Sequence, residues 1–192
     1  MKILFGIILA LILQCNVAQA TDNYRVYSWE EALKSDPSEV LAISFERLKL
    51  DSIPSQLLQF KRLRKLDFSK NKLTSLPDFI QQLGSLEELD LSKNKLIHFP
   101  VQLCSMKQLK KLILSRNAFT QIPDCIQYMS QLNYLDLSDT PVGSFPEAFV
   151  AMPQLKTLVL NGLAYPPTFQ ARWKERLPWM RIEFDAPCHC ME

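Results

Sequence analysis

A 23-residue period runs through the middle of this chain and constrains its fold more than any other feature. Four consecutive rows, from Leu63 to Gln154, read LRKLDFSKNKLTSLPDFIQQLGS, LEELDLSKNKLIHFPVQLCSMKQ, LKKLILSRNAFTQIPDCIQYMSQ and LNYLDLSDTPVGSFPEAFVAMPQ. The row that begins at Val40 keeps the apolar positions but loses the polar ones, and the row from Leu155 starts correctly and then departs. Repeats of this length predict a solenoid, in which each unit contacts only its neighbours.

Each row divides into a strand and a return limb. Around Leu89 and Leu91 apolar and polar residues alternate, which predicts a short strand with one buried face. Stacking one such strand per row builds a parallel sheet, whose apolar side chains are buried only between neighbouring rows. A proline then recurs at one position and, because it fixes φ and lacks an N–H donor, turns the chain into the return limb. These prolines are Pro54, Pro77, Pro100, Pro123 and Pro146.

The rows resemble the leucine-rich repeat pattern L-x-x-L-x-L-x-x-N-x-L-x-x-L-P between about Val40 and Tyr165. They are most similar to the 23-residue class whose second half reads L-P-x-x-I/L, a class that resembles exported bacterial proteins and plant resistance-protein repeats. The resemblance implies an α/β fold, namely a leucine-rich repeat solenoid with a curved parallel sheet, one short strand per repeat and a helical N-terminal cap.

An asparagine recurs where each strand gives way to a turn. The resemblance implies that Asn71, Asn94 and Asn117 form a hydrogen-bonded ladder, since an asparagine side chain both donates to and accepts from buried backbone groups. Other residues hold the same position in the outer rows, so we expect the ladder to fade at both ends. These residues are Leu48, Thr140 and Leu163.

The first twenty residues have the layout of a secretory signal peptide. A positive start at Lys2 precedes an apolar run over Ile3–Leu13, and Ala18-Gln19-Ala20 supplies an A-x-A cleavage site. The apolar run is too short for a membrane span, so we expect no integral span and an exported mature chain. Attachment of a lipid at Cys15 is an alternative, although the residue before it is a poor fit.

The rest of the chain is expected to hold two caps around the repeats. Residues 21–39 form the N-terminal cap with its short helix, residues 40–176 hold about six repeats, and residues 177–192 form a cap strand and a cysteine-containing tail. The caps are needed because the end rows would otherwise expose their core faces. Trp29 and Trp173 are therefore interpreted as cap residues rather than binding anchors.

The N-terminal cap also carries a specific helix signal. Ser28 and Glu31 have the spacing of a capping box, which starts a short helix. Trp29, Ala32 and Leu33 then share one helical face and are expected to cover the first row.

Charge and motif content argue against nucleic-acid binding and against catalysis. Loss of the signal segment removes one of the 22 basic residues and none of the 20 acidic ones, which leaves a net charge of +1 and no clear basic excess. His98 falls at a loop position, and no nucleophile stands beside a positioned base. Asp67, Asp90 and Asp136 recur one per row, as a repeat feature. We therefore expect neither enzymatic activity nor a cofactor.

Four cysteines remain after signal cleavage. Cys188 and Cys190 flank a histidine, but the paired spacings of zinc sites are absent, so we favour a disulfide between them, or from one of them to a cysteine elsewhere, over a metal site. Cys104 and Cys125 lie on the return limbs of adjacent rows. We interpret them as small buried hydrophobic side chains.

The residues between the strand leucines are expected to face outward, onto the concave surface. There the pairs Arg64-Lys65, Glu87-Glu88 and Lys110-Lys111 alternate in sign, so neighbouring strands can balance each other's charge.

Past the third row of charges the outward positions become apolar, which predicts the core and rim of a protein interface. The predicted core is Ile113, Tyr134 and Val159, with Trp179 as a further candidate. The predicted rim is Lys111, Arg116, Asp136 and Lys156.

Three functions fit this sequence. The first is an exported, monomeric, non-enzymatic module that binds a partner protein on its concave face. The second is a structural or adhesive protein of the cell envelope, anchored by a lipid or a disulfide. The third is an intracellular signalling scaffold, which requires that the first twenty residues are not cleaved.

Overall fold

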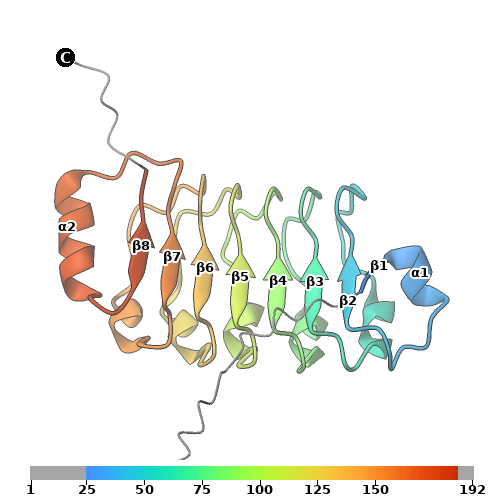
Figure 1. Cartoon of the computed structure of the whole chain (residues 1–192). Coiled ribbons are helices and arrows are strands. Elements are labelled where there is room, and N and C mark those ends of the chain that lie inside the picture. The colour runs from blue at the N-terminus through green and yellow to red at the C-terminus, as the bar shows by residue number, and fades with distance from the viewer. Residues whose placement is uncertain (1–24, 186–192) are drawn as a thin grey trace, which may run out of the picture.

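The computed structural model describes residues 25–185, and within them eight short strands form one parallel sheet in sequence order (Figure 1). Neighbouring strands pair at the 23-residue spacing of the rows, with Leu66 opposite Leu89 as one example. The strands are β1 Val26–Ser28, β2 Ala42–Ser44, β3 Lys65–Asp67, β4 Glu88–Asp90, β5 Lys111–Ile113, β6 Tyr134–Asp136, β7 Thr157–Val159 and β8 Arg181–Glu183.

The return limbs wind into one 3-10 helix each. Each 3-10 helix begins directly after the recurring proline of its row, and the extended backbone of that proline sets the direction of the limb. They are η1 Ser55–Gln59, η2 Asp78–Gln82, η3 Val101–Ser105, η4 Asp124–Tyr128 and η5 Glu147–Ala151. The predicted fold class, a solenoid with one short parallel strand per repeat, is confirmed.

The core lies between the sheet and these limbs. The central leucines of β3 to β7 are almost completely buried, as Leu89 illustrates, and Ile80 closes the core from η2. Aromatic side chains extend the same stack at the N-terminal end, where the rings of Phe45 and Phe68 lie 4.6 Å apart. Each row buries its apolar side chains against its neighbours, as expected for a repeat unit with no core of its own.

The asparagine side chains join adjacent rows by hydrogen bonds at the strand ends. Asn94 donates from Nδ2 to the carbonyl oxygens of Phe68 (2.9 Å) and Leu91 (3.0 Å) and accepts from the Leu73 N–H (3.0 Å). Asn71 and Asn117 repeat this arrangement one row away on either side.

The expectation that the ladder fades at Thr140 needs correction. The Thr140 hydroxyl donates to the Leu114 carbonyl (3.0 Å) and accepts from the Asn117 N–H (3.3 Å), so it takes over part of the ladder. A hydroxyl can do this because it both donates and accepts.

Directly before the ladder position the backbone is left-handed in six consecutive rows. The two lysines of the repeated string SKNKL that hold this position, Lys70 and Lys93, have φ of 58° and 54°. Non-glycine residues rarely adopt this conformation, which shows that the string forms a specific tight turn in each row. The recurrence of SKNKL is therefore explained by this turn rather than by binding of a ligand. Gly162, at φ 90°, is the one glycine among these six residues, and glycine adopts positive φ without steric strain.

The N-terminal cap contains the predicted helix, α1 Trp29–Leu33, and its capping box. The Ser28 N–H donates to Glu31 (2.9 Å), and the Glu31 N–H donates back to the Ser28 hydroxyl (3.3 Å). Trp29 packs on Phe45, and Ala32 is fully buried. The prediction for Leu33 is wrong: it is half exposed, because this five-residue helix ends there. The preceding strand β1 was not predicted, and it extends the sheet by one strand.

The C-terminal cap consists of α2 Pro167–Arg176 and β8, at the opposite end of the sheet from α1 (Figure 1). Trp173 is buried there, 5.2 Å from the ring of Phe145, and so acts as a cap residue. Tyr165 belongs to the same aromatic cluster: its hydroxyl donates to the Val142 carbonyl (2.8 Å), and burial raises its pKa to about 12.

Candidate partner-binding surface

The concave face, the side of the sheet away from the 3-10 helices, neutralises its own charge over β3 to β5. Lys65 pairs with Glu88 at 3.1 Å, and Glu87 accepts ion pairs from Lys110 at 2.8 Å and from Arg64 at 3.5 Å. Each such partly exposed pair contributes about 0.2–1 kcal/mol. Their main consequence is that this half of the face presents little net charge to a partner.

Beyond these pairs the face becomes apolar and aromatic. Ile113 on β5 and Tyr134 on β6 are each half-buried at outward positions, and the Lys111 ammonium lies 5.2 Å from the centre of the Tyr134 ring. This distance permits a cation–π contact. Burial, together with the nearby Asp136 and Glu183, raises the pKa of Tyr134. Its ring therefore stays a neutral, half-exposed contact surface.

Two members of the predicted patch need correction. Val159 is only 7% exposed, because its short side chain lies in register between the longer Asp136 and Glu183 on the adjacent strands. Trp179 lies before β8, and its indole N–H donates to the Met152 carbonyl (3.2 Å), which fixes it in the C-terminal cap. The exposed apolar core of the patch thus reduces to Ile113 and Tyr134.

Two of the predicted rim residues have structural partners. Arg116 lies at a left-handed turn position and forms an ion pair with Asp139 at 2.8 Å. Asp136 accepts hydrogen bonds from the Ser138 N–H (2.9 Å) and hydroxyl (2.6 Å).

The recurring aspartates hold the turns that follow the strands. Asp67 and Asp90 each accept from the N–H of the serine two residues further on, at 2.8 Å in both cases. Burial raises the pKa of the Asp90 carboxyl; hydrogen bonds from Ser92 oppose the shift, and the charges of Asp67 and Asp136 add to it. These hydrogen bonds in the turns explain why the aspartates recur, without any acid–base chemistry.

The patch borders a shallow hollow of about 280 Å³ on the concave face. Its walls come from β3, β4 and β5 and include Asp67, Asp90 and Ile113. A partner side chain that covers Ile113 can therefore also enter a depression of the sheet surface.

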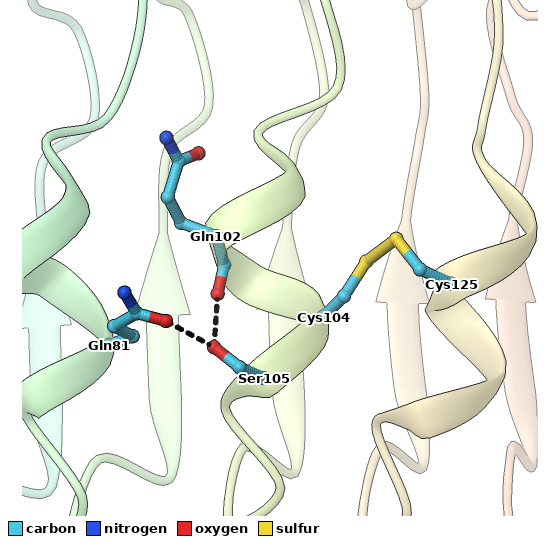
Figure 2. Close-up of a disulfide and its surroundings, with 5 residues drawn as sticks. All are labelled: Gln81, Gln102, Cys104, Ser105 and Cys125. Atoms are coloured by element: carbon cyan, nitrogen blue, oxygen red, sulfur yellow. Dashed lines mark hydrogen bonds between the residues drawn. A yellow bond between two sulfur atoms is a disulfide. The ribbon is translucent and has the colours of Figure 1, made fainter.

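A larger open hollow, of about 890 Å³, lies on the convex side over η2, η3 and η4. Val101 and Tyr128 are strongly exposed at this hollow, whose other lining side chains include Gln81, Gln102 and Ser105. The Ser105 hydroxyl lies 2.9 Å from the Gln81 side-chain oxygen and 2.8 Å from the Gln102 carbonyl (Figure 2). The bond to Gln81 joins η3 to η2, whereas the bond to Gln102 lies within η3.

A disulfide joins Cys104 on η3 to Cys125 on η4 at one wall of this hollow (Figure 2). The interpretation of both as small buried hydrophobic side chains needs correction: Cys104 is buried, but Cys125 is only partly buried and the two are bonded to each other. Their Cα atoms lie 5.6 Å apart, because the two 3-10 helices pack side by side and turn these positions toward each other. The sequence signal was their spacing of 21 residues, two short of the repeat.

The remaining cysteine predictions fall outside the described residues, because Cys15, Cys188 and Cys190 lie before residue 25 or after residue 185. Within residues 25–185 no group of three or more His, Cys, Asp or Glu side chains is placed to hold a metal ion. None of the helices in that part of the chain has the length and apolar character that a membrane crossing requires.

Comparison with known proteins agrees with this architecture. The sequence profile described as leucine rich repeat matches residues 39–96 and 107–162, more than half of the chain. Among solved structures, a leucine-rich repeat protein of Leptospira interrogans is similar, with 30% sequence identity and a TM-score of 0.65. The match covers 71% of this chain and 35% of that protein, so this chain spans about a third of its length. The comparison with curated proteins finds no match.

Proposed function

Because the chain belongs to the leucine-rich repeat family, we propose that it is an exported, monomeric, non-enzymatic protein that binds a partner protein on its concave face. Domains of this family generally mediate protein–protein interactions and typically lack enzymatic activity. For this chain we propose two further features, the binding site on the concave face and the exported location.

One observation carries the concave site. Lateral ion pairs neutralise the face as far as β5, and directly beyond them Ile113 and Tyr134 present half-buried apolar and aromatic surface. Tyrosine is enriched among the side chains that dominate binding energy, and a small apolar core beside charged residues is the usual layout of an interface. The repeat fold itself does not require either side chain, since both point away from the core.

Two observations support export. Residues 1–20 have the composition of a signal peptide, and the Cys104–Cys125 disulfide is of a kind that persists mainly in oxidising compartments. The same disulfide disfavours an intracellular scaffold. An anchored envelope protein is the second candidate, favoured by Cys15 at the end of the apolar run.

Mass spectrometry of the mature protein from its own cell tests the export proposal. We expect an N-terminus at Thr21, produced by cleavage after Ala20. A diacylated Cys15 at the N-terminus would establish the anchored alternative, and a retained Met1 would contradict export.

A double substitution tests the concave site. Ile113→Asp with Tyr134→Asp should weaken partner binding at least 100-fold, because both charges fall in the centre of the interface. Val101→Asp with Tyr128→Asp is the matched control, since it replaces the same kinds of side chain at exposed convex positions. Circular dichroism and thermal unfolding should show that both variants fold.

The assay needs the native partner, which a photo-reactive residue can capture. A photo-reactive phenylalanine analogue at position 134 should cross-link a discrete protein in the native compartment, whereas the same analogue at position 128 should not. Capture only from position 128, together with loss of binding in the control variant, would place the contact in the convex hollow instead.

A further inference from the structure

Lys111 and Lys156 differ from the other cations of the concave face. Lys65 and Lys110 have carboxylate partners, whereas the Lys111 ammonium lies over the Tyr134 ring and the Lys156 ammonium donates to the Pro153 carbonyl (2.7 Å). Among residues 25–185 no carboxylate lies within ion-pair distance of either amino group. Neither lysine therefore forms an ion pair within the part of the chain that the structure describes.

The sequence alone suggested otherwise, because Glu88 lies in register beside Lys111. The structure shows why that pair does not form. Glu88 also lies in register beside Lys65 on its other side, and its carboxylate takes that partner at 3.1 Å. Glu87 reaches cations on both neighbouring rows, whereas Glu88 pairs only with Lys65, and Lys111 is left without an ion pair.

The two lysines flank the tyrosine. Tyr134 is in register with Lys111 on one side and with Thr157 on the other, and Lys156 directly precedes Thr157. Since adjacent strands lie about 4.8 Å apart, β5 and β7 lie about 10 Å apart, with β6 and its Tyr134 between them. The nearest acidic side chain on β6, Asp136, is held by Ser138 two residues further along the strand.

Resting on the proposed concave-face contact, we propose that the partner presents an extended acidic segment that crosses β5, β6 and β7. An apolar side chain of this segment covers Ile113 and Tyr134, and carboxylates on either side bind Lys111 and Lys156. Carboxylate–ammonium hydrogen bonds are roughly twice as strong as neutral ones, and opposite potentials raise the association rate. A basic partner would instead meet two like charges that have no ion-pair partner of their own.

A display library of random 16-residue peptides, screened against the full mature chain, tests this proposal. We expect the bound peptides to be enriched in Asp and Glu around one or two apolar residues. For the best synthetic peptide, Lys111→Glu with Lys156→Glu should weaken binding at least tenfold, and binding to the unaltered chain should fall as salt rises from 50 to 300 mM, a range over which the screening length drops below about 10 Å.

The matched control exchanges an ion pair away from β5, β6 and β7. Lys70 pairs with Glu46 at 2.6 Å, and Lys70→Glu with Glu46→Lys leaves the net charge unchanged and should alter peptide affinity by less than twofold. Enrichment of basic or uncharged peptides, recovery of no peptide, or equal affinity in the Lys111→Glu, Lys156→Glu variant would each overturn the acidic-segment proposal.

A further variant separates this proposal from the concave site itself. Tyr134→Ala changes no charge and should weaken acidic peptides about tenfold if they lie on the tyrosine. Acidic peptides that bind the Tyr134→Ala variant as tightly as the unaltered chain would contradict the concave contact. If peptide binding depends on Tyr134 but not on the two lysines, the concave contact is supported and only the acidic-segment proposal is overturned.

Discussion

Replacing Asn94 with alanine should lower the free energy of unfolding by about 3 kcal/mol, because it leaves a buried backbone donor without an acceptor. Asn94 is 9% exposed, and its side-chain oxygen is the acceptor of the Leu73 N–H. The three carbonyls that accept from its Nδ2 group are affected less. Phe68 O also accepts from Asn71, Leu91 O from Asn117, and Ser92 O from the Lys70 N–H.

The sharing of carbonyls between successive asparagines makes the loss asymmetric. After the substitution each carbonyl keeps one donor, whereas the Leu73 N–H has no other bond, and an unsatisfied buried group costs about 1–3 kcal/mol. The remaining destabilisation comes from the second bond lost at each carbonyl and from the small cavity. Because the ladder joins rows, the loss weakens the contact between rows rather than a single turn.

Urea denaturation of Asn94→Ala measures this effect, and Asn133→Ala is the matched control. Asn133 is exposed on the concave face, so its replacement should change the free energy of unfolding by less than about 0.5 kcal/mol. A loss below 1 kcal/mol in Asn94→Ala would mean that water replaces the side-chain oxygen, and that the ladder contributes little.

The sequence could predict the strands, the return limbs and the place of the asparagines because these features depend on the period alone. Leucines that recur every 23 residues must stack, and a proline after each fifth apolar position must start the limb. Features that depend on contact between two particular side chains could not be predicted from the sequence. Val159 has the outward position of Ile113, yet its neighbours Asp136 and Glu183 cover it.

The same distinction explains the candidate site. The alternation of charges on β3 to β5 was visible in the sequence, and lateral pairing follows from strand spacing. Which lysine remains unpaired was not visible, since Glu88 has a cation in register on both sides and the choice between Lys65 and Lys111 is made by side-chain geometry. The two cysteines posed a similar problem, because they occupy different positions in their rows.

Removing the Cys104–Cys125 disulfide should lower the free energy of unfolding by about 3 kcal/mol, because the bond closes a loop of about 20 residues in the unfolded chain. In a domain of this size that loss corresponds to a fall in melting temperature of about 10 °C. The double variant Cys104→Ala, Cys125→Ala should also show a steeper dependence on urea, since its unfolded state is less compact.

Reductant provides the control that isolates the bond from the packing of its sulfur atoms. Dithiothreitol should destabilise the unaltered chain by nearly the full amount and leave the double variant unchanged. The small remaining difference reports the packing of Cys104, which is 7% exposed. Equal stability of the unaltered chain with and without reductant would contradict the disulfide and restore the interpretation of two buried thiols.

The position of the bond also predicts how the unfolding transition changes. Repeats contact only their neighbours, so the link between η3 and η4 strengthens one interface in the middle of the stack. Without it, the rows from Leu109 onward should lose amide hydrogen-exchange protection before the rows that end at Gln108. The concave strands β5 and β6, which carry Ile113 and Tyr134, lie on the weakened side. Reduction should therefore weaken partner binding before it unfolds the N-terminal rows.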